Sequence, residues 1–275
     1  MQTKRLALYD AAEVIADVKK AVDSGNEIDY VTFMGDGEPT LASNLGEMVE
    51  GVRRFWGGRM ALITNGSMFR LPEVRMAATH FDVISPTVSA GDERTFHQLH
   101  RPLGSLRLDD VLEGLRLFRA EYRGQIWVEL MLVHGVNDSL PALLNIRKAM
   151  KGIGADRVYV NAPIRPPAES WVRPPTKEAL RQVFDIFPEA INMTGPEEGP
   201  FIRNEGEREA ELIEIAKNHP LREDQALGLL AFAMGEEYAR ECLQRIVSAG
   251  RLEVKDYSGT KFYRVPLGRK DGHDE

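Results

Sequence analysis

The stretch Ile28-Asp29-Tyr30-Val31-Thr32-Phe33-Met34-Gly35-Asp36-Gly37-Glu38-Pro39 decides the fold of this 275-residue chain. Its first part, Ile28–Met34, is apolar and contains β-branched residues, which predicts a strand. Gly35 and Gly37 let the backbone after this strand approach a ligand closely. Glu38 then places a carboxylate, suited to an ammonium or hydroxyl donor, at the strand end. An ordinary tight turn with an acidic helix start accounts for the same residues.

On both sides of this stretch, short strand-like runs alternate with helix-like runs. We predict further strands at 59–64, 81–86, 125–132 and 157–161. We predict helices at 11–22, 45–56, 73–78, 108–122, 139–151 and 177–187, with another that starts near Asp92. Such alternation indicates βαβ units and a parallel sheet. The sequence therefore predicts an α/β domain over residues 1–191.

Small polar residues follow the predicted strands. Thr64 and Asn65 come at the end of the second strand, Ser89 follows the third, and Asn161 closes the fifth. Ligands bind at the carboxyl ends of strands in open α/β sheets and in (β/α) barrels. These residues are therefore candidates for a binding site, although each one alone also fits an ordinary turn or helix cap.

Glu129 lies inside the apolar run Trp127–Leu132. A carboxylate in a buried strand is costly unless it is paired or bound to a ligand. Strand alternation places Trp127, Glu129 and Met131 on one face. We favour a functional Glu129 that faces the interior of a barrel, and a structural ion pair is the alternative.

The overall composition is that of an ordinary globular protein, with 43% hydrophobic and 28% charged residues. The formal net charge of −7 argues against tight non-specific binding of nucleic acid. No apolar run approaches the ~20 residues needed to span a bilayer, and the start lacks a signal peptide. We therefore expect a cytoplasmic protein without membrane contact.

The residue types that usually bind metals or carry catalysis do not have the spacing of a known motif in this sequence. The single cysteine, Cys242, allows neither an internal disulfide nor a Cys-rich metal site. We predict that none of four scattered histidines is a metal ligand. They are His80, His97, His100 and His134. Neither a Gly-x-Ser-x-Gly elbow nor a Walker loop is present, which disfavours hydrolases and NTPases.

The last third of the chain has a different pattern. Residues 192–206 are rich in Gly, Pro, Asn and Glu, which is typical of a linker. Helices are predicted at 207–218, 223–233 and 236–249, followed by a hairpin of 251–255 and 261–265. This order predicts a winged helix-turn-helix domain over 207–266 and a disordered tail over 267–275.

The charge of this last part bears on its partner. Residues 207–275 contain 11 Lys and Arg against 14 Asp and Glu, a net charge of −3. A winged helix that reads DNA usually has a basic face. Contact with nucleic acid, docking of a protein and a purely stabilising role therefore remain open.

Taken in order, the strand-end motifs resemble those of the radical SAM superfamily. The matching segments are Val31–Leu41, in a Gly-x-Gly-Glu-Pro-Thr-Leu form, Leu62–Ser67, Glu129–Asp138 and Asn161–Glu169. This form is similar to Fe–S oxidoreductases related to wyosine-type tRNA-modifying enzymes. The resemblance covers roughly residues 1–190, and it leans toward RNA as the unknown substrate.

The resemblance implies a partial (β/α)6 barrel that binds S-adenosylmethionine (SAM) at the carboxyl ends of its strands. The residues implied to hold the methionyl amino group are Gly35, Gly37 and Glu38. Those implied to line the sugar and adenine are Thr64, Asn65, Ser89, Glu129 and Asn161. No catalytic residue is implied beyond these binding residues.

The chain departs from the family where a complete member carries a Cys-x3-Cys-x2-Cys loop after its first strand. Three thiolates of that loop hold a [4Fe–4S] cluster, which donates an electron to SAM. This chain begins after that place, so we expect a barrel missing its first strand, with the Ile28–Met34 strand as an apolar edge. A truncated chain or a misassigned start codon is favoured over a natural cluster-free variant, and we expect no radical chemistry from the chain as given.

Three functions follow from these observations. The first is a radical SAM protein, for which an in-frame Cys-x3-Cys-x2-Cys upstream of Met1 would support truncation and an immediate upstream stop codon would exclude it. The second is a cluster-free SAM-binding regulatory protein or a nucleic-acid-binding winged-helix protein. The third is an unrelated barrel enzyme that uses Glu38 and Glu129 as an acid/base pair.

Overall fold

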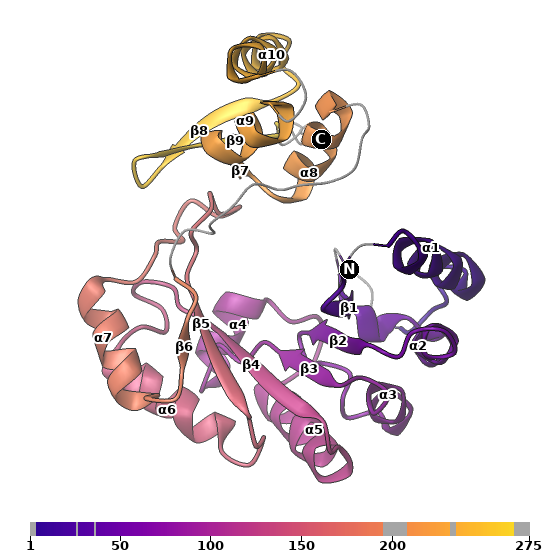
Figure 1. The fold of residues 1–275 in the computed structure, drawn as a ribbon. Helices are drawn as coiled ribbons and strands as arrows, with labels where there is room; N and C mark the ends of the chain where they lie inside the picture. Colours follow the sequence, from indigo (N-terminus) through magenta and orange to yellow (C-terminus); the bar gives the residue numbers. More distant parts are fainter. Residues whose placement is uncertain (1–3, 26, 36, 195–207, 232–234, 267–275) are drawn as a thin grey trace, which may run out of the picture. The chain divides into compact units, whose positions relative to one another are not determined.

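The computed structural model describes residues 4–25, 27–35, 37–194, 208–231 and 235–266 (Figure 1). They divide into two compact units. The first comprises residues up to Ala162 together with Val172–Thr194, and the second comprises Pro163–Trp171 together with the residues from Gly195 onward. The segment Pro163–Trp171, which falls inside the predicted first domain, therefore belongs with the second unit.

The first unit is built on a six-stranded sheet in which all paired strands run parallel, in the order β1-β2-β3-β4-β5-β6. Its strands are β1 (Tyr30–Phe33), β2 (Arg59–Thr64), β3 (Val83–Pro86), β4 (Gln125–Met131), β5 (Arg157–Asn161) and β6 (Ile191–Asn192). The predicted α/β class with a parallel sheet is confirmed. Of the described strands, none pairs with the free side of β1, which forms an edge of the sheet.

Helices connect the strands, and Figure 1 shows α2, α3, α5 and α6 along the outer side of the curved sheet. The helical elements are α1 (Ala11–Asp23), the short 3-10 helix η1 (Pro39–Leu41), α2 (Leu45–Arg53), α3 (Pro72–Ala78), α4 (Glu93–His100), α5 (Leu108–Glu121), α6 (Leu140–Met150) and α7 (Lys177–Ile186). Four of these helices, α1, α4, α6 and α7, follow a residue whose side chain accepts a hydrogen bond from an amide of the first turn. These capping residues are Asp10, Asp92, Ser139 and Thr176.

The core lies between the sheet and the outer helices. On β4, Ile126, Val128 and Leu130 are fully buried toward the helices, whereas Trp127 and Glu129 on the other face are half-buried. Each fully buried side chain of this size contributes about 1.5–3 kcal/mol through the removal of apolar area from water. The predicted alternation of β4 is confirmed, and the inner face of the sheet stays partly accessible.

Aromatic side chains meet across this inner face. The rings of Tyr30 and Trp127 lie 5.9 Å apart, although β2 and β3 stand between their strands. The ring of Trp127 also lies 5.8 Å from that of Tyr159, and the Arg157 guanidinium stacks over it at 4.9 Å. Because rings on β1 and β4 touch, the sheet must curl around them, as the strands of a partial barrel do.

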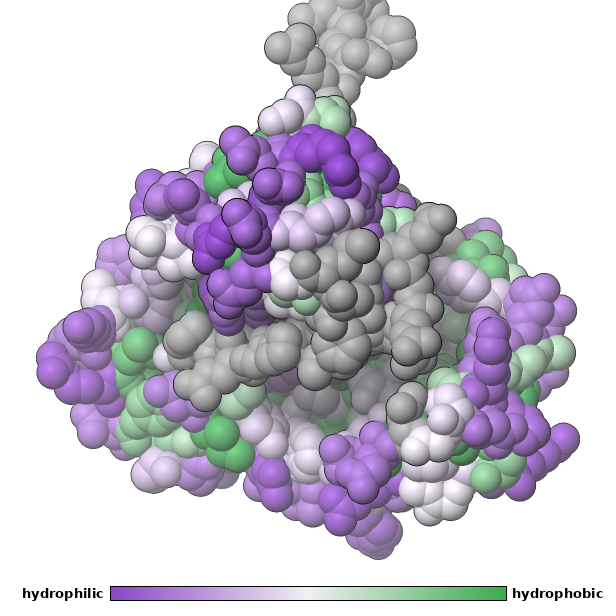
Figure 2. Space-filling view, turned by 45° about the horizontal axis from the view of Figure 1, so that its top comes forward, coloured by the Kyte–Doolittle hydropathy of each residue, from purple (hydrophilic) through white to green (hydrophobic). Residues whose placement is uncertain are grey.

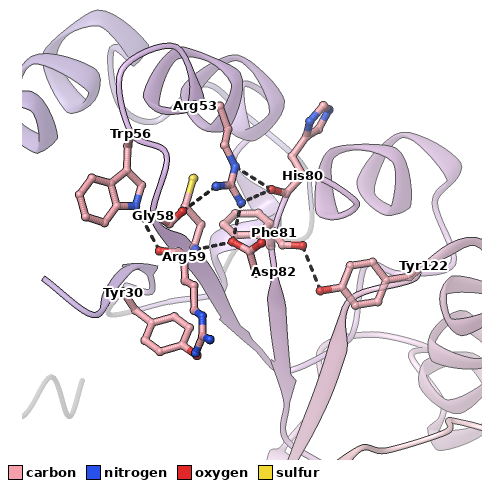
Figure 3. Close-up of polar contacts among 10 residues, drawn as sticks. Tyr30, Arg53, Trp56, Gly58, Arg59, His80, Phe81, Asp82 and Tyr122 are labelled. Carbon is pink, nitrogen blue, oxygen red and sulfur yellow. Dashed lines mark hydrogen bonds and ion pairs between the residues drawn. The ribbon is translucent and has the colours of Figure 1, made fainter.

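A network around Asp82 ties the amino ends of β2 and β3 together, and Figure 3 shows its carboxylate turned toward Arg53. Asp82 Oδ2 accepts hydrogen bonds from Arg53 Nη2 at 2.6 Å and from the Met60 amide at 2.7 Å. Arg53 also donates to the carbonyls of Gly58 and His80. Partial burial raises the pKa of the Asp82 carboxyl, but the donors from Arg53 and Met60 outweigh it and leave that pKa below its usual range.

The second unit contains three helices and a small antiparallel sheet of order β7-β9-β8. Its elements are α8 (Arg208–Asn218), β7 (Leu221–Arg222), α9 (Glu223–Ala231), α10 (Glu236–Ser248), β8 (Glu253–Tyr257) and β9 (Thr260–Arg264). The predicted helices and hairpin are present, and Ser258 and Gly259 turn the hairpin with φ angles of 53° and 78°. Tyr257 donates a hydrogen bond to the Pro163 carbonyl at 2.9 Å, which ties Pro163–Trp171 to this unit.

Two short strands, β6 and β7, were not predicted from the sequence. Residues 195–206 of the predicted linker and the whole predicted tail 267–275 lie outside the described residues. Among the helices that the structure describes, none is long and apolar enough to cross a bilayer. In the view of Figure 2, the hydrophobic residues on the coloured surface lie in small groups among hydrophilic ones.

Candidate functional site

The carboxylate of Glu38 organises the carboxyl ends of β1 and β2. Its Oε1 accepts hydrogen bonds from the Thr64 hydroxyl at 2.6 Å, the Thr40 hydroxyl at 2.5 Å and the Thr40 amide at 3.1 Å. Its Oε2 accepts one from the Asn65 amide at 2.7 Å. The structure therefore brings Glu38, Thr64 and Asn65 together. Among the described residues, Oε2 accepts a hydrogen bond from the Asn65 amide alone, so it keeps capacity for a ligand donor.

Gly35 and Gly37 are exposed just before this carboxylate. A Cβ atom on Gly37 would meet nothing within 4 Å, and one on Gly35 would come no nearer than 3.9 Å to the Gly37 amide nitrogen. Packing therefore does not require glycine at either position. An open backbone of this kind fits a ligand that approaches the main chain closely. Asp36, between them, lies outside the described residues.

Glu129 lies on the inner face of β4, beside Tyr159 of β5. Its backbone carbonyl accepts a hydrogen bond from the Val88 amide at 2.9 Å. Its carboxylate forms no hydrogen bond or ion pair with the residues that the structure describes, and burial raises the pKa of the Glu129 carboxyl. The alternative of a structural ion pair is therefore not seen in the described part of the chain.

Asn161 shares this inner face at the end of β5. It is the register partner of Met131, and its carbonyl accepts a hydrogen bond from the Leu132 amide at 2.9 Å. Its side chain is half-buried. Because Tyr159 and Asn161 alternate with buried Val160, Asn161 projects to the same side as Glu129, one step nearer the carboxyl edge.

Ser89 differs from the other candidates because it is almost fully buried. Its hydroxyl accepts a hydrogen bond from the Met131 amide at 3.0 Å, and its carbonyl accepts one from Asn137 Nδ2 at 2.8 Å. These contacts join the segment after β3 to the end of β4. The fold itself accounts for Ser89, and its accessible surface of 2% leaves little for a ligand to touch.

The loop after β4 contains a contact that was not predicted from the sequence, between His134 and Asp138. Asp138 is 8% exposed and accepts hydrogen bonds from the Gly135 amide at 2.8 Å and from His134 Nδ1 at 2.9 Å. Asn137 is fully buried and holds the same loop. The Asn-Asp pair just before helix α6 was the available signal, because such residues fix turns through their side chains.

The described residues contain no group of three His, Cys, Asp or Glu side chains that could hold a metal ion. Cys242, the single cysteine, is buried in the second unit, where its Sγ lies 3.1 Å from Glu209 Oε1. These residues do not fit a [4Fe–4S] cluster. The open backbone at Gly35 and Gly37, the hydrogen-bonded carboxylate of Glu38, and the carboxylate of Glu129, which has no partner among the described residues, do fit a ligand with an ammonium group and hydroxyls, as SAM has.

The fold and the clustered strand-end residues define an α/β protein with its candidate site at the carboxyl ends of parallel strands. The sequence profile of the radical SAM superfamily matches residues 2–145, and the chain belongs to that superfamily. UPF0026 protein MJ1312 of Methanocaldococcus jannaschii is 31% identical over 276 residues, which cover 98% of this chain and 84% of the relative. A UPF0026 protein of Helicobacter pylori strain J99 is 27% identical, covering 91% and 80%.

Solved structures agree on the fold. A radical SAM methyltransferase from Sphaerobacter thermophilus has a TM-score of 0.50 at 21% identity, covering 67% of this chain and 56% of its own. SuiB from Streptococcus suis, in a structure bound to SAM, has a TM-score of 0.53 at 12% identity, covering 68% and 44%. This chain thus spans about half the length of either protein, and the likeness concerns the fold alone.

Proposed function

We propose that the first unit binds SAM across the carboxyl ends of β1, β2, β4 and β5. The observation that carries this proposal is the carboxylate of Glu129, which is half-buried inside the curved sheet and has no partner among the described residues. Burial without a partner costs free energy that folding does not recover. A ligand with hydroxyl groups, such as the ribose of SAM, would supply the missing donors.

The residues of the site would then have distinct roles. The backbone at Gly35 and Gly37, together with Glu38 Oε2, would receive the methionyl ammonium group. Glu129 and Asn161 would contact the ribose and adenine. In contrast with the roles implied by the family, the Thr64 hydroxyl and the Asn65 backbone amide would orient Glu38 rather than touch SAM, because both already donate to its carboxylate.

When SAM and a reduced [4Fe–4S] cluster are bound together, they supply 5′-deoxyadenosyl-radical chemistry, which removes a hydrogen atom from a substrate. The one cysteine of this sequence lies in the second unit, so the thiolates would have to come from outside this sequence. SAM binding and oxidoreductase chemistry are therefore separate parts of the proposal. RNA as the substrate, and a branch related to wyosine-type enzymes, rest on the resemblance of the motifs.

Isothermal titration calorimetry with SAM tests the binding site. We expect Glu38→Ala and Glu129→Gln each to weaken SAM binding about tenfold or more, the size expected for hydrogen bonds to charged groups. Glu113→Gln, an exposed carboxylate on α5, is the matched control and leaves the affinity unchanged. Wild-type affinity in both site variants would refute the assignment.

We propose further that the second unit is a winged helix-turn-helix that docks a protein. The order α8-β7-α9-α10-β8-β9 supports the first part. On α10 the exposed side chains include Glu236, Glu237 and Glu241, and the nearby Arg245 pairs with Glu209. A helix with this charge is poorly suited to a DNA groove.

Fluorescence anisotropy with labelled DNA and RNA duplexes tests the partner of this unit. We expect no saturable binding below about 10 µM at 0.15 M salt, where non-specific binding by a basic domain is already measurable. Tighter binding of either duplex would instead favour the alternative, a cluster-free SAM-binding or nucleic-acid-binding regulatory protein. Iron-free protein that binds SAM would fit that alternative as well as the first proposal.

A further inference from the structure

Arg5 lies in the segment before α1 and binds the turn that carries Glu38. Its Nε donates a hydrogen bond to the Thr40 carbonyl at 2.9 Å, and its Nη2 donates one to the Ala42 carbonyl, also at 2.9 Å. The guanidinium thus holds the two carbonyls that flank Leu41. Both bonds come from a charged donor, which makes them stronger than bonds between neutral groups.

The backbone next to Arg5 reinforces the same contact. The Leu6 amide donates to the Leu41 carbonyl at 3.0 Å, and the Ser43 amide donates to the Leu6 carbonyl at 3.0 Å. These bonds make an isolated parallel bridge between Leu6 and Ala42. The segment therefore reaches the turn through four hydrogen bonds, two from a side chain and two between backbones.

Thr40 connects this contact to the candidate site. Its side chain is fully buried, and its hydroxyl and amide both donate to Glu38 Oε1, at 2.5 and 3.1 Å. Its carbonyl is the group that Arg5 Nε holds. Thr40 thus connects the Arg5 guanidinium to the Glu38 carboxylate. A shift of Thr40 would move the hydroxyl and the amide that donate hydrogen bonds to Glu38.

The surroundings of Arg5 suit a guanidinium rather than an ammonium group. Its side chain is only 15% exposed, and the carboxylate of its ion-pair partner Glu73 lies 3.8 Å from Nη1 and is itself 53% exposed. An ion pair at this distance whose carboxylate is open to solvent contributes little to stability. The two carbonyls need donors at two positions at once, which the planar fork of Arg provides and the single point charge of Lys does not.

We propose that Arg5 is a positioning residue of the SAM site, which fixes Glu38 by holding Thr40 and Ala42. This inference rests on the proposed function only for its consequence on SAM binding. The effect on the order of Glu38 and its donors follows from the contacts alone. The two consequences can therefore be measured separately.

The first experiment is amide hydrogen exchange, which needs no ligand. In Arg5→Gln and Arg5→Ala we expect the amides of Thr40 and Asn65, which donate to Glu38, to exchange about fivefold faster, the factor that corresponds to one net hydrogen bond. The amide of Met131, held by Ser89 at the same edge of the sheet, is the internal control and keeps its rate. Glu73→Gln removes only the ion pair, and we expect it to leave the exchange rates of the Thr40 and Asn65 amides unchanged.

A double-mutant comparison separates positioning from a general loss of order. If Arg5 acts through Glu38, then Arg5→Ala accelerates exchange of the Asn65 amide in the wild-type background but adds nothing in Glu38→Ala, where that partner is gone. An equal acceleration in both backgrounds, or one that extends to Met131, would overturn the proposal. Unchanged Thr40 and Asn65 amides in Arg5→Ala would overturn it as well.

The second experiment is calorimetry with SAM. We expect Arg5→Ala to weaken SAM binding about fivefold, Arg5→Lys to recover part of that loss, and Glu73→Gln to behave as wild type. Wild-type protein that binds no SAM would refute the proposed function, and the exchange experiment would still decide the role of Arg5. Wild-type SAM affinity in Arg5→Ala would refute the positioning role alone.

Discussion

The Glu38 carboxylate and the Thr64 hydroxyl lie 2.6 Å apart, although 26 positions separate the two residues in the sequence. Thr64 ends β2, which pairs directly with β1, and Glu38 follows β1 in the sequence. Parallel neighbours bring their carboxyl ends to one edge of a sheet, so the residues after both strands meet there. The bond links the two ends and fixes the orientation of the carboxylate.

Replacement of Thr64 tests this link. Thr64 is 3% exposed, and its hydroxyl donates to Glu38 and accepts from the Gly66 amide at 3.0 Å. We expect Thr64→Val, which keeps the shape, to lower the free energy of unfolding by about 1–2 kcal/mol because it leaves buried polar groups without partners. Thr64→Ser keeps the hydroxyl and should lose less. Urea denaturation measures both variants, and equal losses in the two would contradict a role for the hydrogen bonds.

Asp82 lies at the opposite, amino end of the strands. We expect its carboxylate to make the free energy of unfolding depend on pH. The pKa of its carboxyl lies below the usual range because Arg53 and the Met60 amide, working against partial burial, favour the charged form. A lowered pKa in the folded state stabilises the fold above the unfolded-state pKa of about 3.9, and the contribution disappears as pH falls through the folded-state value.

The test compares wild type with Asp82→Asn by urea denaturation between pH 7 and pH 3. We expect the variant to be less stable by about 1 kcal/mol at pH 7, a modest figure because the carboxylate is 45% exposed. The difference in the free energy of unfolding between wild type and Asp82→Asn should stay constant down to about pH 5 and decrease below about pH 4. A difference that does not change over this range would show that the charge of Asp82 is not its cause.

Asn137 should be a strong determinant of stability. It is fully buried, its Oδ1 accepts from the Val133 amide at 2.7 Å, and its Nδ2 donates to the carbonyls of Ser89 and Met131, each at 2.8 Å. Asn137→Ala would leave all three backbone groups unpaired, which we expect to cost about 3 kcal/mol or more. Asn145→Ala, on the exposed face of α6, is the control, and similar thermal midpoints for the two variants would refute this role.

Much of this architecture could be predicted from the sequence, because strand alternation and strand-end polarity are local patterns. The alternation in β4 predicted that Trp127 and Glu129 share one face of the sheet. The turn residues after Thr64 predicted that Thr64 lies at the edge of the sheet, where its strand ends. The strand β6 could not be found, since the two residues Ile191 and Asn192 are too few for a period to show. The contact of Arg5 with Thr40 was also out of reach, because a side chain that binds distant carbonyls leaves no periodic signal.

Glu129 should show opposite effects on stability and on ligand binding. Burial raises the pKa of its carboxyl in the folded state, so the charged form is disfavoured there and stability is lost as pH rises above the unfolded-state pKa of about 4.3. Glu129→Gln removes the charge and keeps the shape. It should therefore unfold at a higher temperature than wild type at pH 7, while the two should converge near pH 4.

The same substitution should weaken SAM binding, because the carboxylate that destabilises the empty site is the one proposed to accept the ribose hydroxyls. A residue retained at a cost to stability is typical of a functional site. Thermal unfolding with and without SAM measures both effects, since a ligand that binds the folded state raises the midpoint. We expect SAM to raise the midpoint of wild type by more than that of Glu129→Gln. A variant that is less stable than wild type at pH 7 would mean that Glu129 supports the fold itself.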